Sequence, residues 1–301
     1  MYSNRISLYR ELEQKRESKV LTYITGDRPG LETKIASEVY DYFVNHLDKI
    51  LSTNKISFFL YTRGGDTLAA WSIINLLYQF ADEVEIIVPS KCHSAGTLMS
   101  LGAKRIVMTK QATLGPIDPS IDNPLNPQIP GADPSAKAAV SVEAIEGYIQ
   151  LIKEKCEFNR RHDSNKLIEV LSEKIHPLVL GQVYRTKVQI KMLASRLLNH
   201  QLVDQKSKQR VIDFLCSESG SHDYTIHREE AKEGLGLNIE KPDDDLYAII
   251  KKIYDDIESE LELTSRFDIN SFLGAQSEKN YSFRRCLIET ISGGSNYYVT
   301  E

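Results

Sequence analysis

The sequence contains little that would mark an exported, membrane-spanning or disulfide-rich protein. Its four cysteines, Cys92, Cys156, Cys216 and Cys286, lie far apart and form no CxxC pair. This spacing is typical of reduced thiols rather than of a disulfide framework or a cysteine zinc site. No apolar run approaches the roughly 18 residues of a spanning helix, and the polar start lacks the apolar segment of a signal peptide. We therefore expect a cytoplasmic protein.

Basic charge and metal-binding patterns are also scarce. The 37 lysines and arginines are outnumbered by 42 aspartates and glutamates, which gives a formal net charge of -5. Nucleic acid is not expected as a partner, because phosphate binding requires a basic surface. His222 and His227 lack the four-residue spacing of a helical zinc pair. We expect neither a metal ion nor another cofactor.

What the sequence does contain is a regular alternation of apolar runs and helical patterns over the first 110 residues. We predict strands at residues 19–25, 56–62, 83–89 and 105–109, and helices at residues 31–52, 67–80 and 94–103. Short apolar runs that alternate with helices indicate buried parallel strands joined by crossover connections. The predicted fold class is therefore α/β.

The composition changes after residue 115. A loop at residues 116–136 holds most of the ten prolines, and helical patterns follow it from about Val142. They include a helix expected in "HREEAKEGLG", and the chain ends in strand-like stretches around a Gly-Gly turn. We divide the chain into an α/β domain at residues 1–240, which includes the proline-rich loop, and a helical extension with a strand-like tail at residues 241–301.

Ser94 stands directly after the third predicted strand, in "KCHSAGTL". A serine hydroxyl is a poor nucleophile unless a base and oxyanion donors surround it, and the start of the following helix offers free N–H groups. Serine is equally a preferred helix N-cap. The residues alone leave both roles open.

A glycine pair follows the second predicted strand, in "YTRGGDTLAAW". In an open α/β sheet, the carboxyl ends of the strands line the ligand crevice. Gly64 and Gly65 would let the backbone approach a ligand there, although a simple turn capped by Asp66 explains them too. Two such turns on neighbouring strands favour a functional site.

The motifs "GGDTLAAW", "SAGTLMSLGAKRIVM" and "ATLGPIDPS" together resemble the Clp-protease/crotonase superfamily. Within it, residues 23–237 are most similar to the serine dehydrogenase proteinase family, relatives of signal peptide peptidase A. The resemblance implies a spiral of ββα units and a serine peptidase with Ser94 as nucleophile. It also implies an oxyanion hole formed by the Gly65 and Ala95 amides, with Gly64 shaping the approach.

The general base has several candidates. By resemblance to the signal peptide peptidase branch, Lys137 after the proline-rich loop would form a serine–lysine dyad, which requires a lowered lysine pKa. His222 with Asp223 could instead supply a base and its orienting carboxylate. His93 adjoins Ser94, but adjacent side chains on a turn usually diverge. Lys137 is the preferred base at this point.

Three functions remain open from the sequence. Hydrolysis of peptide bonds through an acyl-enzyme is favoured by the Ser94 turn. A crotonase-like acyl-CoA enzyme would use the same pair of amides without needing the serine, and a non-catalytic scaffold or peptide-binding protein would need neither.

The resemblance further implies a homo-oligomer. An apolar stripe in the C-terminal helix could face a partner subunit or the protein's own core; it consists of Leu246, Ile249, Ile250, Ile253, Ile257 and Leu261.

Overall fold

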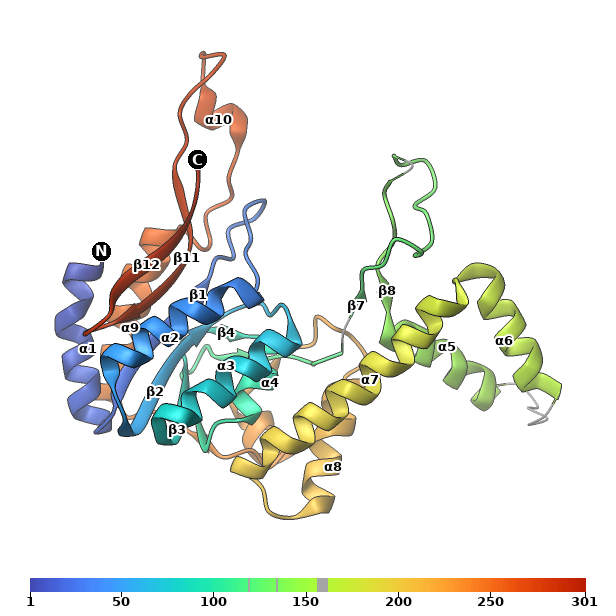
Figure 1. Cartoon of the computed structure of the whole chain (residues 1–301), viewed down its shortest axis with the longest axis horizontal. Helices are drawn as coiled ribbons and strands as arrows, with labels where there is room; N and C mark the ends of the chain where they lie inside the picture. The colour runs from blue at the N-terminus through green and yellow to red at the C-terminus, as the bar shows by residue number, and fades with distance from the viewer. Residues whose placement is uncertain (119, 134, 156–161) are drawn as a thin grey trace.

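The computed structural model describes residues 1–118, 120–133, 135–155 and 162–301. A body built on a seven-stranded sheet occupies one side of the molecule, and an arm of helices projects from it (Figure 1). The strand order in this sheet is β10-β5-β3-β2-β1-β11-β12. The α/β fold class is confirmed.

The centre of the sheet is parallel and its outer part is antiparallel. The parallel strands are β1 (Lys19–Thr25), β2 (Thr53–Tyr61), β3 (Ala81–Val88), β5 (Arg105–Met108) and β10 (Ile239–Glu240). The chain end adds the hairpin β11 (Phe283–Thr290) and β12 (Gly294–Thr300), with β11 antiparallel to β1. The four predicted strands and the strand-like tail are confirmed, with shifts of a few residues at their ends.

Helices cover both faces of the sheet, which explains why its strands read as continuous apolar runs. Leu21 of β1 packs with α2 (Tyr40–Ile50), α3 (Thr67–Phe80) and α4 (Ala95–Leu101) in one core cluster. Val20, the next residue back, belongs to the second cluster, with α1 (Tyr2–Arg16) and α9 (Asp244–Leu261). Successive side chains of a strand point to opposite faces, so both faces of β1 need apolar residues.

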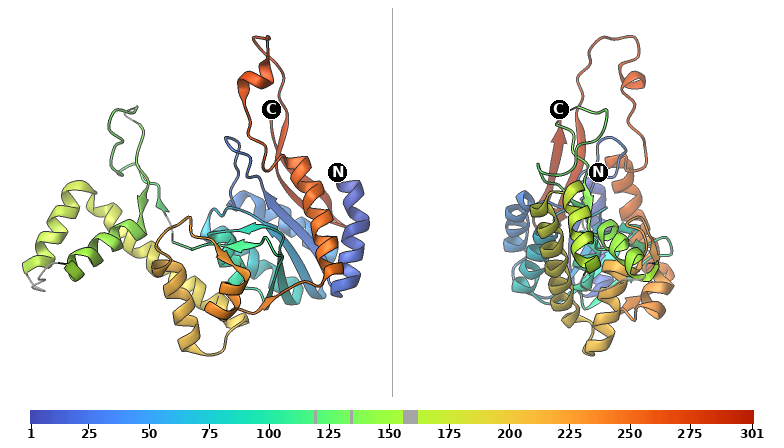
Figure 2. Two further views of the ribbon diagram at one scale, coloured as in Figure 1. Left: turned by 180° about the vertical axis from the view of Figure 1, so that it is seen from behind. Right: turned by 90° about the vertical axis from the view of Figure 1, so that its right-hand side faces the viewer.

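The apolar stripe of α9 is covered by the protein's own core. Leu246, Ile250, Ile253, Ile257 and Leu261 are buried in the cluster shared with α1, beside which α9 lies (Figure 2, left). Because this helix packs on the sheet and β11 joins β1, residues 241–301 share the hydrophobic core of the body. The stripe therefore carries no argument for a partner subunit.

Two predicted helices are wrong in part. Only the second half of the helix expected at residues 31–52 forms, as a 3-10 turn at Ser37–Val39 followed by α2. Residue Ile35 is instead held by a bridge to Gly65, with Ile35 N–H donating to the Gly64 carbonyl at 2.8 Å. The helix expected in "HREEAKEGLG" starts one residue later and continues as a π-helix at Glu230–Gly234, while His227 belongs to β9 (Ile226–His227), which pairs with β6 (Thr113–Leu114).

The polar N-terminal segment forms α1 (Tyr2–Arg16), a helix that was not among those predicted. Arg5 of this helix is fully buried and forms an ion pair with Glu289 of β11 at 2.5 Å. Tyr9 also donates a hydrogen bond to Glu289, at 2.6 Å. A buried charge is tolerated only when it is paired in this way. Polar residues of the N-terminal segment thus lie inside the body.

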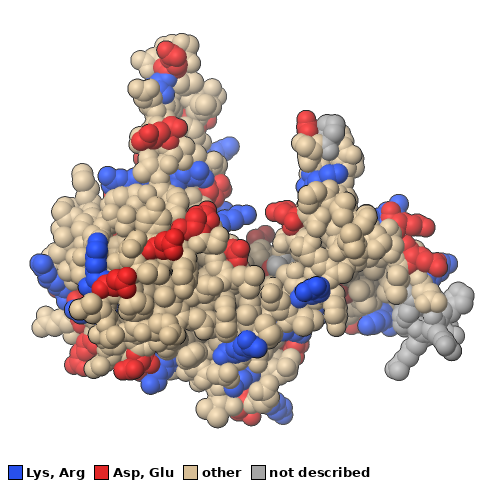
Figure 3. Space-filling view, in the orientation of Figure 1, with Lys and Arg blue, Asp and Glu red and all other residues tan. Residues whose placement is uncertain are grey.

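The arm begins where the proline-rich loop leaves the body. It contains the short hairpin β7 (Ser120–Ile121) and β8 (Val140–Ser141), followed by the helices α5 (Val142–Lys155) and α6 (His162–Lys174). The long helix α7 (Pro177–Leu197) then leads back to α8 (Gln205–Asp213) and a π-helix at Phe214–Glu218. Its small core is separate from the two clusters of the body and consists of Ile121, Val140, Val142, Ile145, Val179 and Val183. Basic and acidic side chains are interspersed on the face seen in Figure 3.

The cysteines and helices of the described segments add two observations. Cys92, Cys216 and Cys286 are buried free thiols, and Cys156 lies outside the described residues. Among the helices of the described segments, none is both long and apolar enough to cross a membrane.

Candidate active site

The first half of the candidate site is the turn that follows β2. Gly64 and Gly65 have φ angles of 114° and 146°, in the region that favours glycine. A Cβ on Gly65 would lie only 2.3 Å from the Ile35 carbonyl oxygen, so no side chain fits. Asp66 caps α3 by accepting hydrogen bonds from two backbone amides, as expected.

The second half is the turn between β4 (Lys91–Cys92) and α4, where Ser94 lies. Ser94 has φ 51° and ψ -116°, a conformation that is strained for a residue with a side chain. It occupies the N-cap position of α4, but its side chain forms no capping hydrogen bond. The interpretation of Ser94 as a simple helix cap is therefore wrong. Among the described residues, none forms a hydrogen bond with Ser94 Oγ.

The two turns face each other at close range. Thr62 bridges Cys92 in parallel, with Thr62 N–H donating to the Lys91 carbonyl and His93 N–H donating to the Thr62 carbonyl, both at 3.0 Å. A Cβ on Gly64 would lie 2.7 Å from Ser94 Cβ and 3.1 Å from Ser94 Oγ. Because Gly64 has no side chain, its own backbone can lie directly beside the Ser94 hydroxyl.

Two backbone amides beside this hydroxyl are free to bind a ligand. The bridge to Ile35 uses the Gly64 carbonyl and the Asp66 amide, and leaves out the Gly65 amide. Ala95 is the first residue of α4, so its N–H has no partner within the helix. Within the described part of the chain, neither the Gly65 nor the Ala95 amide donates to a protein acceptor. Paired free amides of this kind can stabilise an oxyanion.

His222 lies near these turns and is paired with a carboxylate that the sequence reasoning missed. Its Nδ1 is 3.0 Å from Oδ1 of Asp118, whose side chain is only 3 % exposed. The hydrogen bond to Asp118 raises the pKa of His222 above its ordinary value of 6.5, against the opposing effect of burial. Asp223, expected as the orienting residue, lies next along the chain, and its carboxylate forms no hydrogen bond with His222 among the described residues.

The loop that carries Asp118 is attached to the helix that carries Ser94. Gly115 N–H donates to Thr97 Oγ1 of α4 at 3.0 Å, and Ile117 N–H donates to the Leu215 carbonyl at 2.9 Å. The motif "ATLGPIDPS" that supported the family resemblance contains this aspartate. The motif was therefore the signal by which Asp118 could have been found. What the sequence did not reveal was its partner, His222, 104 residues further along the chain.

Lys137 lies in a different part of the molecule. It pairs with Gln128 in the exposed loop between β7 and β8, which projects from the arm and away from the sheet (Figure 1). The structure therefore does not bring Lys137 to Ser94 within this chain.

His93 adjoins Ser94 but is held elsewhere. Its Nε2 lies 2.8 Å from Thr113 Oγ1. Burial lowers the pKa of His93 to about 4, and the nearby Lys91 lowers it further in the same direction. This histidine is neutral at pH 7, and its Nε2 is occupied by Thr113. The ring supports the turn rather than the serine.

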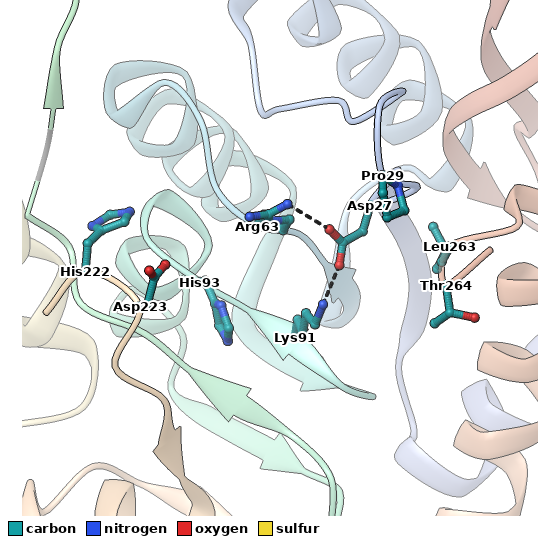
Figure 4. Close-up of a pocket in the computed structure, with 9 residues that line it drawn as sticks. All are labelled: Asp27, Pro29, Arg63, Lys91, His93, His222, Asp223, Leu263 and Thr264. Atoms are coloured by element: carbon teal, nitrogen blue, oxygen red, sulfur yellow. Dashed lines mark hydrogen bonds and ion pairs between the residues drawn. The ribbon is translucent and has the colours of Figure 1, made fainter. Parts of the chain in front are cut away.

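A cavity of about 500 Å³ adjoins the two turns (Figure 4). Arg63, which precedes Gly64, and His93, which precedes Ser94, both line it. His222 and Asp223 lie at one end, and Asp27, Pro29, Leu263 and Thr264 lie at the other. A strained serine, two free amides, a histidine–carboxylate pair and an open cavity are the parts that acyl transfer requires.

These parts lie together on two strand-to-helix turns of an α/β fold. Residues 1–135 match the model of the ClpP-like SDH-type serine proteinases, which confirms the resemblance found in the motifs.

The curated relatives are uncharacterised proteins. MJ0137 of Methanocaldococcus jannaschii is 29 % identical over 245 residues, which cover 78 % of this chain and 73 % of that protein. MJ1495 of the same organism is 25 % identical over 247 residues, covering 79 % and 73 %.

Two solved structures are similar at low identity. An alanine mutant of the 1510-N membrane-bound stomatin-specific protease is 18 % identical, with a TM-score of 0.39 and coverage of 70 % of this chain and 77 % of that one. ClpP1 from Listeria monocytogenes is 15 % identical, with a TM-score of 0.41 and coverage of 79 % and 99 %.

Proposed function

We propose that this protein hydrolyses peptide bonds through an acyl-enzyme on Ser94. The observation that carries the proposal is the geometry of Ser94. The residue is held at φ 51°, its hydroxyl forms no hydrogen bond to the described residues, and the backbone of Gly64 abuts it. Strain of this kind persists only where surrounding structure enforces it, and it is concentrated at functional sites. The match of residues 1–135 to the model of the ClpP-like SDH-type serine proteinases supports the same activity.

The chemical steps follow from the positions of the groups. Ser94 Oγ attacks the scissile carbonyl carbon and gives its proton to a base, and the carbonyl oxygen becomes an oxyanion. The amides of Gly65 and Ala95 donate hydrogen bonds to that oxygen. Collapse of the intermediate breaks the C–N bond, and the base returns the proton to the leaving amine. Water then repeats the sequence on the ester and releases Ser94.

We assign the base to His222, positioned by Asp118. With Nδ1 bound to the buried carboxylate, Nε2 is the nitrogen left to accept the serine proton. The carboxylate also stabilises the imidazolium that forms. Hydrogen bonds between nucleophile and base often tighten only when substrate binds, so we expect Ser94 and His222 to form theirs on the bound peptide. The alternative base is Lys137, which would require the loop between β7 and β8 to approach the body.

A fluorophosphonate probe tests the proposed activity directly. We expect the probe to label the protein once, on the tryptic peptide spanning residues 92–104, because only an activated serine reacts. The Ser94→Ala variant should remain unlabelled. The matched control is Ser100→Ala, in the same helix, which should be labelled like the wild type because Ser100 hydrogen-bonds to the Gly96 carbonyl away from the turn. Absence of labelling combined with coenzyme A binding would favour the acyl-CoA alternative. Absence of both would favour the scaffold.

We also propose that the protein forms a homo-oligomer through its arm. One side of α7 exposes Leu178, Tyr184, Val188 and Met192, each more than 40 % accessible. These residues lie on a helix whose other side is buried, and apolar side chains grouped on one surface mark interaction sites. We expect light scattering to give a mass that is a multiple of 34.2 kDa, and Tyr184→Glu to lower it. A mass that stays at the monomer value across a concentration series would contradict the proposal.

A further inference from the structure

The wall of the cavity that lies away from His222 carries two cations on one buried carboxylate. Asp27, in the loop after β1, is 6 % exposed. Lys91 Nζ lies 2.5 Å from Asp27 Oδ2, and Arg63 Nη1 lies 3.3 Å from Asp27 Oδ1. Lys91 and the Tyr61 hydroxyl both donate hydrogen bonds to Asp27, the latter at 2.8 Å. Arg63 and Lys91 thus lie on either side of Asp27 and line the cavity with it (Figure 4).

The two cations share one close carboxylate. Asp27 pairs with both of them, whereas the second carboxylate, Glu32, lies at the edge, 3.9 Å from Arg63. The Arg63 and Lys91 side chains are 54 % and 45 % exposed, so they keep contact with the cavity. An ammonium group has three N–H donors and a guanidinium five, which is more than Asp27 uses. The wall therefore retains N–H donors of two cations for a further anion.

The backbone connects this cluster to the two turns of the candidate site. Arg63 directly precedes the Gly64–Gly65 pair, and Lys91 lies three residues before Ser94. The two residues are on neighbouring chain segments that are joined by the hydrogen bond from Thr62 N–H to the Lys91 carbonyl. A substrate held by the Gly65 and Ala95 amides would thus have its adjacent groups beside these two cations.

We propose that Asp27, Arg63 and Lys91 form a substrate subsite for a carboxylate next to the scissile bond. The carboxylate is either the side chain of an acidic residue or the C-terminal carboxylate of the peptide. The inference rests on the proposed peptidase function and adds a substrate class to it. An apolar side chain would desolvate the two cations without replacing their hydrogen bonds, and a basic one would be repelled. Asp27 pairs with both cations and competes with the substrate carboxylate for them.

Peptide binding to the Ser94→Ala protein tests the subsite separately from turnover. The probes are fluorescein-labelled alanine octapeptides with one Glu, Gln or Lys at each position in turn, each made as the C-terminal acid and as the C-terminal amide. At low salt, we expect the best Glu peptide amide, or the C-terminal acid, to bind about tenfold more tightly than its neutral counterpart. The comparison of acids and amides identifies the source of the carboxylate. Equal binding of charged and neutral peptides, or no binding at all, would overturn the proposal.

Variants that remove a positive charge and a variant that removes a negative charge separate the electrostatic effect from structural damage. Added to Ser94→Ala, Arg63→Gln and Lys91→Gln should each remove most of the preference for a carboxylate. Asp27→Asn should increase the preference, because it removes the competing anion while keeping an oxygen for the Tyr61 hydroxyl. The matched control is Lys104→Gln, an exposed cation paired with Glu83 on another part of the sheet, which should change nothing. A preference that survives both cation variants would overturn the assignment.

Turnover by the unmodified protein distinguishes the two proposals. Hydrolysis with equal kcat/KM for Glu and Gln peptides would reject the subsite and retain the peptidase. A carboxylate preference in binding without any hydrolysis would retain the subsite and reject the peptidase. Because the two cations are partly exposed, the preference should also weaken as ionic strength rises through the physiological range.

Discussion

Replacing Ser94 with alanine is expected to reduce peptide hydrolysis by about 10⁶-fold in kcat, the scale seen when a catalytic serine is removed from a serine protease. The reason is that, among the described residues, Ser94 provides the only hydroxyl in the turn that lies beside Gly64 and the free amides of Gly65 and Ala95. The measurement is cleavage of a quenched fluorescent peptide by the purified variant and the wild type. The melting temperature should be retained, because Ser94 Oγ forms no hydrogen bond that the fold would lose.

The matched control for this experiment is Ser100→Ala. Ser100 is buried in the same helix and donates to the Gly96 carbonyl at 3.0 Å. Its loss should lower stability by about 1 kcal/mol, the usual contribution of one hydrogen bond, and leave turnover in place. Undiminished cleavage by Ser94→Ala would reject Ser94 as the nucleophile. Loss of cleavage together with loss of folding would be recognised by circular dichroism.

The comparison of His222→Ala with Lys137→Ala is expected to give the second largest difference. We expect His222→Ala to lower kcat by about 10⁴-fold or more, because Ser94 loses its proton acceptor. Lys137→Ala should retain near-normal turnover, since Lys137 lies in the exposed loop of the arm. His227→Ala, which removes an exposed histidine from β9, is the control. If only the lysine variant loses activity, the histidine assignment is wrong and a serine–lysine dyad replaces it.

The pH profile of kcat/KM provides an independent test of the same base. His222 accepts a proton only when it is neutral, so activity should rise with pH through its pKa, which Asp118 holds above 6.5. Asp118→Asn removes the anion that raises this pKa, so the acidic limb should move to lower pH while the rate falls. An acidic limb that does not move in Asp118→Asn would contradict the pairing of these residues.

The local sequence determined much of the body and the two turns of the site. Apolar runs of the right length specify β1, β2, β3 and β5, because a strand buried on both faces needs apolar side chains at every position. The Gly64–Gly65 pair and "HSAG" identified the two turns. Close approach of the backbone needs small residues, and within each motif these residues are adjacent in the sequence. The α/β class and the family resemblance follow from these short-range patterns.

Tertiary structure decided the features that depend on distant partners. Ile35 belongs to a helical pattern, but it is extended because it pairs with Gly65. Arg5 looks solvated, but it is buried because Glu289, 284 residues away, neutralises it. Periodicity reports which face of an element is apolar and does not report what covers that face, which is why the α9 stripe alone could not distinguish the core from a partner.

The candidate base shows the same division. His222 was recognisable as a possible base, but its neighbour Asp223 was the only carboxylate that the local sequence could offer as a partner. The structure supplies Asp118 instead, buried and 104 residues earlier in the chain. A hydrogen bond between side chains depends on where the folded chain brings their atoms. Residue types and local turns are therefore written in the sequence, whereas the pairing that gives His222 its raised pKa exists only once the sheet, the loop after β6 and the segment before β9 have packed together.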